Sequence, residues 1–422
     1  MNININKPDT FEINMPENVA EIISTIEANG FEAFAVGGCV RDTLLGRNPD
    51  DWDITTSALP GEIKAMFPRT IDTGIQHGTV TIMIGKTGYE VTTYRIDGEY
   101  EDGRHPASVE FSSKLADDLK RRDFTINAMA YNNTSHLVDE FNGIIDLNNK
   151  IIRCVGDAKE RFSEDALRMM RAIRFSAQLK FSIEEQTYAA ILTLAPTIAK
   201  VSMERVQIEL GKTLVSENPD YVIKFVETGL FKDKLPVIDR LLSDSHRKTA
   251  LAMLRATKPA LILRLAALLY FASPEETRKT LRSLKLDNHT VDTVTKLVTH
   301  AQTEISEVET DVREALHVYG KDFFPLLLDI QDAAITAKEN VTGIMLTSKR
   351  NHLAVLRSLA DMILERGDCF TIKDLAVTGH DLMKYGLTGP AIGQTLDKLL
   401  HIVIENPNLN DKDALIAMIE NM

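Results

Sequence analysis

The chain has 422 residues, of which 44% are hydrophobic and 26% charged, and its formal net charge is −13. This length predicts about two to four domains with a large core, and the composition is typical of a soluble protein. The first residues show no signal-peptide pattern and no run reaches the ~18 apolar residues of a membrane span, so we expect a cytoplasmic protein without a membrane partner. Three widely separated cysteines favour a reducing compartment and argue against a zinc site: Cys39, Cys154 and Cys369.

The negative charge is concentrated in the first part of the chain. Residues 1–150 hold 13 Lys and Arg against 24 Asp and Glu, whereas the remainder holds 35 against 37. The segment 245–285 contains nine basic residues and only two acidic ones. A local basic surface on an acidic protein is typical of phosphate-backbone binding, although each residue alone is also explained by a solvated helix face. The nine are Arg247, Lys248, Arg255, Lys258, Arg264, Arg278, Lys279, Arg282 and Lys285.

The segment 34–54 holds a glycine pair and an acidic pair. An apolar run at 31–36 predicts a short buried strand that ends in Gly37-Gly38. Glycine allows the backbone to approach a ligand closely, and its N–H groups can form an anion-binding nest. Gly-Gly alone is also explained as a turn.

Asp51-Trp52-Asp53-Ile54 follows and is interpreted as a strand. Side chains alternate along a strand, so we expect Asp51 and Asp53 on one face and the two apolar residues in the core. Adjacent carboxylates raise the cost of ionising each other, and a divalent cation such as Mg²⁺ removes that cost. Either motif alone is also explained without function, but their coincidence within twenty residues favours nucleotide chemistry.

The rest of the first 155 residues mixes helices and strands. Residues 17–30 predict an amphipathic helix, and Pro60 begins another. Residues 78–95 predict a hairpin with Glu90 on its second strand, either on an exposed face or as a third carboxylate beside the aspartates. We interpret 96–112 as a mobile loop that covers a site. A helix at 117–130 and short strands at 137–139 and 151–153 complete this part.

A new helix is predicted to begin with Ser163 as its N-cap and Glu164 and Asp165 in its first turn, where acids suit the helix dipole. Beyond it every segment predicts helix, and 259–271 is interpreted as buried rather than membrane-spanning. His380-Asp381 is treated as structural. The predicted helices are 183–195, 202–215, 219–230, 247–256, 258–271, 274–285, 288–303, 305–318, 322–337 and 343–366.

Four motifs together resemble the class II tRNA nucleotidyltransferases, the family of CCA-adding enzymes and bacterial poly(A) polymerases. They are Gly37-Gly38-x-x-Arg41-Asp42 with Asp51-x-Asp53, Arg121-Arg122-Asp123-Phe124-Thr125-x-Asn127-Ala128, the region of Asp146, and Glu164-Asp165-x-x-Arg168-x-x-Arg171-x-x-Arg174-Phe175. The likeness covers about 30–215, and 377–393 is similar to the C-terminal domain of Gram-positive CCA-adding enzymes. It implies an α+β nucleotidyltransferase head with a mixed sheet (1–155), followed by an all-α neck (156–215), body (216–335) and tail (336–422).

The resemblance also implies a reaction and its residues. The head would add C, C and A from CTP and ATP to the 3′ end of tRNA, with release of pyrophosphate, and the body and tail would bind tRNA. Asp51 and Asp53 would hold two Mg²⁺ ions, with Glu90 as a further catalytic carboxylate. The implied nucleotide-binding residues are Gly37, Gly38 and Arg41 at the triphosphate, Arg122, Asp123 and Asn127 at the ribose, and Asp165, Arg168, Arg171 and Arg174 in the neck.

Asp165 and Arg168 match the pair that reads the incoming base. We expect them one helical step apart (i,i+3), where they present a hydrogen-bond acceptor and a donor together, which suits both cytosine and adenine. Uracil and guanine present a carbonyl oxygen to the carboxylate instead, at a cost of about 1–3 kcal/mol. The arginines Arg168, Arg171 and Arg174 would repel one another unless anions lie nearby.

Full CCA addition is the favoured activity. The loop 97–111 is similar to that of full CCA-adding members, apart from His105 where arginine is common. Poly(A) polymerases usually carry a basic C-terminal extension, whereas the last residues of this sequence are acidic and neutral. A CC-only or A-only adding enzyme, a poly(A) polymerase, and a non-catalytic tRNA-binding protein remain alternatives. A homodimer is also left open.

Overall fold

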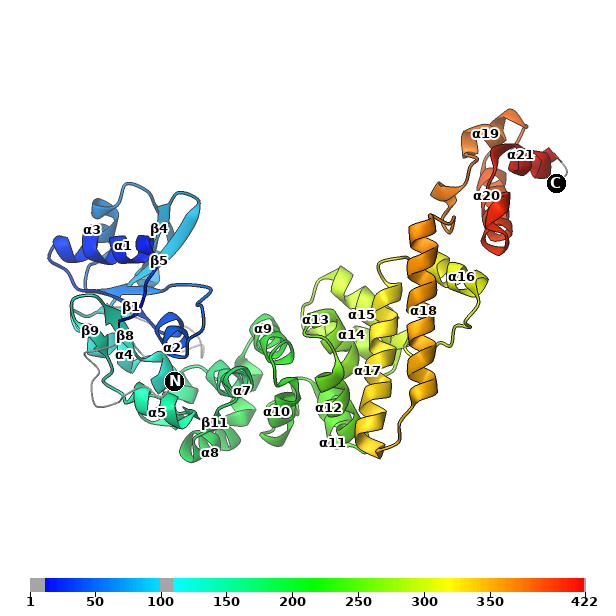
Figure 1. Cartoon of the computed structure of the whole chain (residues 1–422). Helices are drawn as coiled ribbons and strands as arrows, with labels where there is room; N and C mark the ends of the chain where they lie inside the picture. The colour runs from blue at the N-terminus through cyan, green and yellow to red at the C-terminus, as the bar shows by residue number, and fades with distance from the viewer. Residues whose placement is uncertain (1–11, 99–108, 421–422) are drawn as a thin grey trace. The chain divides into compact units, whose positions relative to one another are not determined.

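The structure is a computed structural model that describes residues 12–98 and 109–420, and the chain divides into two compact units, 1–239 and 240–422. Figure 1 shows the strands gathered in the first unit, and the described part of the second unit is helical. A mixed sheet followed by helices confirms the predicted fold class. Among the described residues, none of the helices combines the length and apolar character needed to span a membrane.

The main sheet has seven strands in the order β3-β4-β5-β2-β1-β8-β9. Their bounds are β1 Ala33–Val36, β2 Ile54–Thr56, β3 Thr70–Gly74, β4 Thr79–Ile84, β5 Thr87–Thr93, β8 Ala130–Asn132 and β9 His136–Val138. Neighbouring strands are antiparallel, except that β2 runs parallel to β5. All four residues of β1 are buried, as the apolar run predicted.

Helix α1 (Glu17–Ala28) packs on β1 and β2 through four buried side chains spaced three or four apart, which confirms the predicted amphipathic helix. Helix α3 (Pro60–Met66) contacts β4. The other helices of the first unit are α2 Gly38–Leu44, α4 Leu115–Lys120, α5 Gly143–Asn149, α6 Ala158–Glu164, α7 Leu167–Leu179, α8 Glu185–Leu194, α9 Met203–Leu214 and α10 Ile223–Glu227. Two small strand pairs join β6 (Arg95–Asp97) to β7 (Val109–Phe111) and β10 (Ile151–Ile152) to β11 (Ser182–Ile183). The tip of the predicted loop, 99–108, lies outside the described residues.

The predicted helix at 117–130 is wrong, because α4 ends at Lys120. The Asp123 carboxylate accepts a hydrogen bond from the backbone N–H of Phe124 (2.8 Å), which competes with continued helical bonding. A single 3₁₀ turn follows at Thr125–Asn127, and the chain then enters β8.

The predicted helix start at Ser163 is also wrong. Helix α6 begins earlier, with Asp157 as its N-cap, so Ser163 lies in its last turn. The chain breaks at Asp165, whose side chain accepts a hydrogen bond from the N–H of Leu167, the first residue of α7 (3.0 Å). Asp165 therefore lies between two helices rather than in the first turn of one.

The second unit is a succession of helices, several with bounds close to those predicted. Helix α11 (Pro236–Ser243) spans the division at residue 239. The others are α12 Arg247–Ala256, α13 Leu261–Leu268, α14 Pro274–Ser283, α15 Asn288–His300, α16 Glu309–Tyr319, α17 Phe324–Thr342, α18 Thr347–Arg366, α19 Gly379–Lys384, α20 Pro390–Glu405 and α21 Lys412–Glu420. Helix α13 is largely buried, as predicted. Asp381 has a structural role, because it forms a capping box with Thr378 and an ion pair with Lys412.

The basic segment 245–285 is only partly a surface. Arg264 is 5% exposed, and its Nε donates to the backbone carbonyls of Thr257 and Lys258, so it belongs to the core. Arg278 and Lys258 form ion pairs with carboxylates. Four basic residues of the segment are exposed, and their side chains form no hydrogen bond or ion pair within the described chain: Lys248, Lys279, Arg282 and Lys285.

Candidate active site

A polar cavity of about 320 Å³ lies in the first unit, where β1 ends and the chain approaches β2. Helices α7 and α9 supply its other wall. Its volume falls within the range of small-molecule sites, roughly 300–1,000 Å³. It is lined by Gly37, Gly38, Cys39, Arg41, Asp42, Pro49, Asp50, Asp51, Asp53, Arg122, Asp123, Asn127, Arg171, Arg174, Phe175 and Lys212.

The two aspartates lie just before a strand rather than within one. Strand β2 begins at Ile54, one residue after Asp53. The Asp53 carbonyl accepts a hydrogen bond from the N–H of Val36, the last residue of β1 (3.0 Å). Ile54 is buried as predicted, but Trp52 is only half-buried. Asp51 and Asp53 nevertheless line the same cavity.

Both carboxylates lack a protein partner. Across residues 12–98 and 109–420, neither Asp51 nor Asp53 takes part in a side-chain hydrogen bond or ion pair. Poor hydration within the cleft raises the pKa of Asp53, and the charge of Asp51 raises it further, while Arg122 opposes both effects. Two unpartnered carboxylates, one of which raises the cost of ionising the other, suit a hard divalent cation.

Position 37 requires glycine, both because of its backbone conformation and because Arg122 lies close to it. Its φ is +85°, in the region that favours glycine, and an added Cβ would lie 2.9 Å from Nη1 of Arg122. Gly38 has no comparable constraint, since an added Cβ would meet Arg41 at an ordinary 3.7 Å. The turn therefore brings bare backbone against a guanidinium at the cavity wall.

We expect Gly37→Ala to impair the site more than the fold. A positive φ costs an alanine about 1–2 kcal/mol, and the added methyl group must also displace Arg122. Gly46→Ala is the matched control, because Gly46 has φ +71° but open space around its Cβ position. Both variants should lose about 1–2 kcal/mol of unfolding free energy from the positive φ, with a further loss in Gly37→Ala from the displaced Arg122, but only Gly37→Ala should lose nucleotide affinity. Equal nucleotide affinity in the two variants would contradict the role of this turn.

The residues of the second motif form a connected network. Arg41 Nη1 donates to Asn127 Oδ1 (2.6 Å), and Asn127 Nδ2 donates to Asp123 Oδ1 (3.1 Å). The other oxygen of Asp123 accepts from Arg171 Nε (2.7 Å). Burial alone would raise the pKa of Asp123, but Arg171 and Asn127 lower it to about 2. The network fixes the orientation of each polar group at the cavity wall.

Arg122 also lines the cavity, but a different carboxylate holds it in place. Its Nη2 donates to the fully buried Asp118 (3.1 Å), which also binds Arg121. Its Nε is buried and has no hydrogen-bond partner in the part of the chain that the structure describes. An unpaired buried donor beside two free carboxylates is typical of a site that is completed by a ligand.

The arginines of α7 meet carboxylates of the chain itself, so the anions that we expected are partly internal. Arg168 pairs with Glu164, Arg171 with Asp123, and Arg174 with Glu209. Glu209, on α9, is only 4% exposed. The guanidinium groups of Arg41, Arg171 and Arg174 also surround the Phe175 ring, at 5.0, 5.3 and 3.9 Å from its centroid.

Comparison with known proteins identifies the family. Family models match at 33–153 (Poly A polymerase head domain), 180–242 (probable RNA and SrmB-binding site of polymerase A) and 262–419 (tRNA nucleotidyltransferase domain 2, putative). The CCA-adding enzyme of Levilactobacillus brevis is 38% identical, with 98% of each chain covered. The chain belongs to the CCA-adding enzyme family. A second relative, the CCA-adding enzyme of Lactiplantibacillus plantarum, is 39% identical, with 94% of this chain and 93% of the relative covered.

A solved CCA-adding enzyme has the same fold. The crystal structure of the Bacillus stearothermophilus CCA-adding enzyme in complex with CTP is 32% identical and gives a TM-score of 0.76, with 96% of this chain and 98% of that chain covered. As a nucleotidyltransferase of the CCA-adding family, the protein uses a divalent metal ion.

Two expected residues of this CCA-adding enzyme, Asp165 and Arg168, are not among those that line the cavity. Both Asp165 oxygens accept hydrogen bonds from Arg205 (3.1 and 2.7 Å). Arg168 donates to Glu164 and to the backbone carbonyl of Arg121. The helix break separates the pair that we expected on one helical face.

Glu90 is exposed on β5 and is also absent from the cavity lining. The parallel register sets Ile54 opposite Val91, so Asp53 and Glu90 precede opposed residues on neighbouring strands. Glu90 thus lies beside the acidic pair in the sheet without entering the cavity wall.

Several lining residues were absent from our sequence-based set. Asp42 binds Arg41 through two hydrogen bonds, and its place in the first motif was the available signal. Cys39 is buried, and burial together with Asp53 raises its pKa to about 11, so it is no nucleophile. Lys212 follows Glu209 by one helical turn, a spacing that is also typical of an exposed helix face. The others are Pro49, Asp50 and Phe175.

Proposed function

We propose that this protein adds C, C and A to the 3′ end of tRNA, using CTP and ATP and no nucleic-acid template. One observation carries the proposal: a cavity in a chain of this family combines two unpartnered carboxylates with a glycine turn and a wall of arginines. Such a cavity suits a triphosphate on one side and a divalent cation on the other. The three cysteines are free and buried, which agrees with the cytoplasm as the place of this activity.

We assign the nucleotide-contacting roles as follows. Gly37, Gly38 and Arg41 would bind the triphosphate, together with Arg171 and Arg174 from α7. Arg122, Asp123 and Asn127 would recognise the ribose 2′-hydroxyl, because their network fixes donors and acceptors at the cavity wall. The unpaired Nε of Arg122 supports a polar ligand at this wall.

Asp51 and Asp53 would hold the divalent metal, for which we propose Mg²⁺. Their oxygens are unpartnered, and the raised pKa of Asp53 reflects a pair that a cation would stabilise. Metal bound there would favour ionisation of the tRNA 3′-hydroxyl and stabilise the departing pyrophosphate. Glu90, next to Asp53 in the sheet register, remains a candidate helper carboxylate.

Asp165 and Arg168 remain our candidates for reading the base. Arg205 holds the Asp165 carboxylate and Glu164 holds Arg168, so each group has a fixed orientation within its pair. We also propose that the chain is divided into a head (1–155), a neck (156–215), a body (216–335) and a tail (336–422). The body and tail would bind tRNA, with the exposed lysines of the basic segment as phosphate contacts.

We expect Asp165→Ala to relax base selection. Without the carboxylate, the carbonyl of uracil is no longer repelled, so the preference for CTP over UTP should fall roughly 5- to 150-fold, as expected for about 1–3 kcal/mol. Glu185→Ala is the matched control, because Glu185 is an exposed acid of the same helical region. The measurement is the ratio of kcat/KM for the two nucleotides, and an unchanged ratio in folded Asp165→Ala would refute base reading by Asp165.

Incubation of tRNA trimmed of its 3′ end with Mg²⁺ and labelled CTP or ATP tests the proposed function. We expect two C additions, then one A, and then termination. CTP incorporation without later ATP incorporation indicates a CC-adding enzyme, ATP incorporation only onto ends that carry CC indicates an A-adding enzyme, and long A tails indicate a poly(A) polymerase. Incorporation of neither nucleotide, with tRNA binding intact, indicates a non-catalytic tRNA-binding protein.

A further inference from the structure

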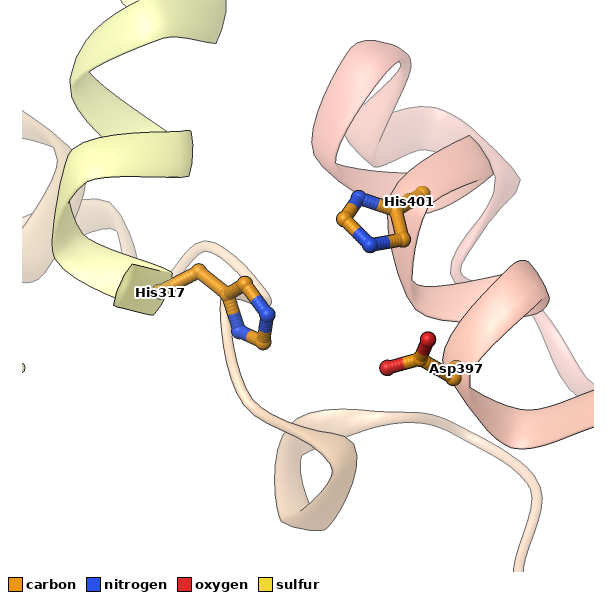
Figure 2. Close-up of side chains that lie close together, drawn as sticks. All are labelled: His317, Asp397 and His401. Carbon is orange, nitrogen blue, oxygen red and sulfur yellow. The ribbon is translucent and has the colours of Figure 1, made fainter. Parts of the chain in front are cut away.

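A second cluster of chemically active side chains lies in the second unit, outside the cavity. His317 of α16 meets Asp397 and His401 of α20, and candidate ligand atoms of the three lie within 4.8 Å of one another. Figure 2 shows the three side chains pointing toward one another across the space between the two helices. The imidazole rings of His317 and His401 have centroids 5.6 Å apart and are nearly perpendicular.

The spacing along α20 contributes to this convergence. Asp397 and His401 are four residues apart, so they lie on one face of the helix, one turn from each other. The opposite side of α20 is anchored in the tail core by buried side chains such as Leu399, Leu400 and Val403. The cluster therefore combines two ligands from one anchored helix with one ligand from a helix about eighty residues earlier in the chain.

A hydrogen bond selects the tautomer of His317, and a carboxylate lies near the same ring nitrogen of His401. His317 Nδ1 lies 2.9 Å from the carbonyl oxygen of Phe370, which can only accept, so Nδ1 carries the proton. His401 Nδ1 lies 3.5 Å from a carboxylate oxygen of Glu314, which favours a proton on Nδ1 electrostatically. With the proton on Nδ1, each ring keeps a lone pair on Nε2. Metal-binding histidines typically have this arrangement, with one nitrogen oriented by a carbonyl or carboxylate and the other on the metal.

We propose that His317, Asp397 and His401 bind one divalent transition-metal ion, for which Zn²⁺ is the best candidate. Two imidazoles and a carboxylate are a ligand set for zinc, whereas Mg²⁺ and Ca²⁺ prefer oxygen ligands throughout. Three protein ligands leave a coordination position for water. Our expectation against a zinc site was based on the cysteines, and this site uses none of them.

Such an ion would strengthen an existing contact between helices α16 and α20. Arg313, on α16, is 3% exposed, donates through Nε to the Ile404 carbonyl of α20 (2.7 Å), and pairs with the buried Asp368. The metal would add a second cross-link on the more exposed side of the same contact. Its role would be structural, at a distance in sequence from every residue of the candidate active site.

The test is zinc binding by the full-length chain after treatment with a chelator. Titration is followed by calorimetry in excess Mg²⁺, which occupies the Asp51–Asp53 carboxylates, and Co²⁺ absorption reports the ligand set. We expect one equivalent of Zn²⁺ per chain, with affinity reduced at least about tenfold by His317→Ala, His401→Ala or Asp397→Asn. His380→Ala is the matched control, because His380 is an exposed histidine of the same tail, and it should bind like the wild type.

The expected gain in thermal stability is a second readout. Zn²⁺ should raise the melting temperature of the wild type and of His380→Ala more than that of Asp397→Asn at the same concentration. Asp397→Asn keeps the shape of an exposed side chain, so it should remain folded and keep the test decisive. Absence of zinc binding by the wild type, or equal binding by the wild type and folded Asp397→Asn and His401→Ala, would overturn the proposal.

Discussion

Asp53→Asn should abolish nucleotide addition and at the same time raise the melting temperature of the metal-free protein. Asp53 has a raised pKa because the cleft walls exclude part of the water around its carboxylate, although the side chain is exposed, and because Asp51 lies near. An acid whose pKa rises on folding destabilises the folded state at every pH above its ordinary 3.8, so neutralising it relieves that cost at pH 7. The same change removes a proposed metal ligand, for which we expect a loss in kcat of at least about 10²-fold.

Asp50→Asn is the matched control for this prediction, because Asp50 is exposed and lines the same cavity but has no assigned role. Its activity should stay within a few-fold of the wild type. Addition of Mg²⁺ should raise the melting temperature of the wild type more than that of Asp53→Asn, since the ion binds only the intact pair. Full activity in Asp53→Asn, or its failure to fold, would show that the carboxylate has another role.

Asp123→Asn should lower the unfolding free energy of the first unit by about 2 kcal/mol at pH 7, because the buried carboxylate binds Arg171 and has a pKa of about 2 against an ordinary 3.8. The sign follows from the lowered pKa. The stabilisation is fully present above the ordinary value and is lost as the pH falls through the folded value. The difference between wild type and variant should therefore be constant near neutrality and shrink between about pH 4 and pH 2.

Urea unfolding followed by the fluorescence of Trp52 measures this effect. Trp52 is the single tryptophan of the chain and lies beside the cavity, so it reports the first unit even if the second unfolds separately. Asp72→Asn is the control, because its ion pair with Lys64 is exposed and should contribute less than about 1 kcal/mol. A loss for Asp123→Asn that is as small as the control, or that does not change with pH, would contradict the assigned network.

Elements with a strong local pattern were predictable from the sequence. The buried run of β1, the turn between β4 and β5 and the apolar stripe of α1 each lie within a few residues, and the structure confirms them. The two helix errors have a shared cause. Asp123 and Asp165 each use a side-chain oxygen to bond the backbone one or two residues ahead, which ends the helical pattern without a glycine or proline to mark it.

The residues of the candidate site were predictable where they belong to a recognisable sequence motif. They were less predictable where the site depends on contacts between residues that are far apart in the sequence. Gly37, Asp51, Asp53 and Asn127 line one cavity as expected. In contrast, the partner of Asp165 is Arg205, which lies forty residues later in the sequence. The hydrophobic periodicity of the two segments does not predict that these residues form a pair. Lys212 was missed for the same reason.

A crystal structure with CTP and Mn²⁺, analysed by anomalous scattering, tests most directly whether the acidic pair and the glycine turn form the nucleotide site. We predict an anomalous peak against the carboxylates of Asp51 and Asp53, with the triphosphate beside Gly37 and Arg41. A metal peak away from those carboxylates, or CTP bound outside this cavity, would contradict the proposed site.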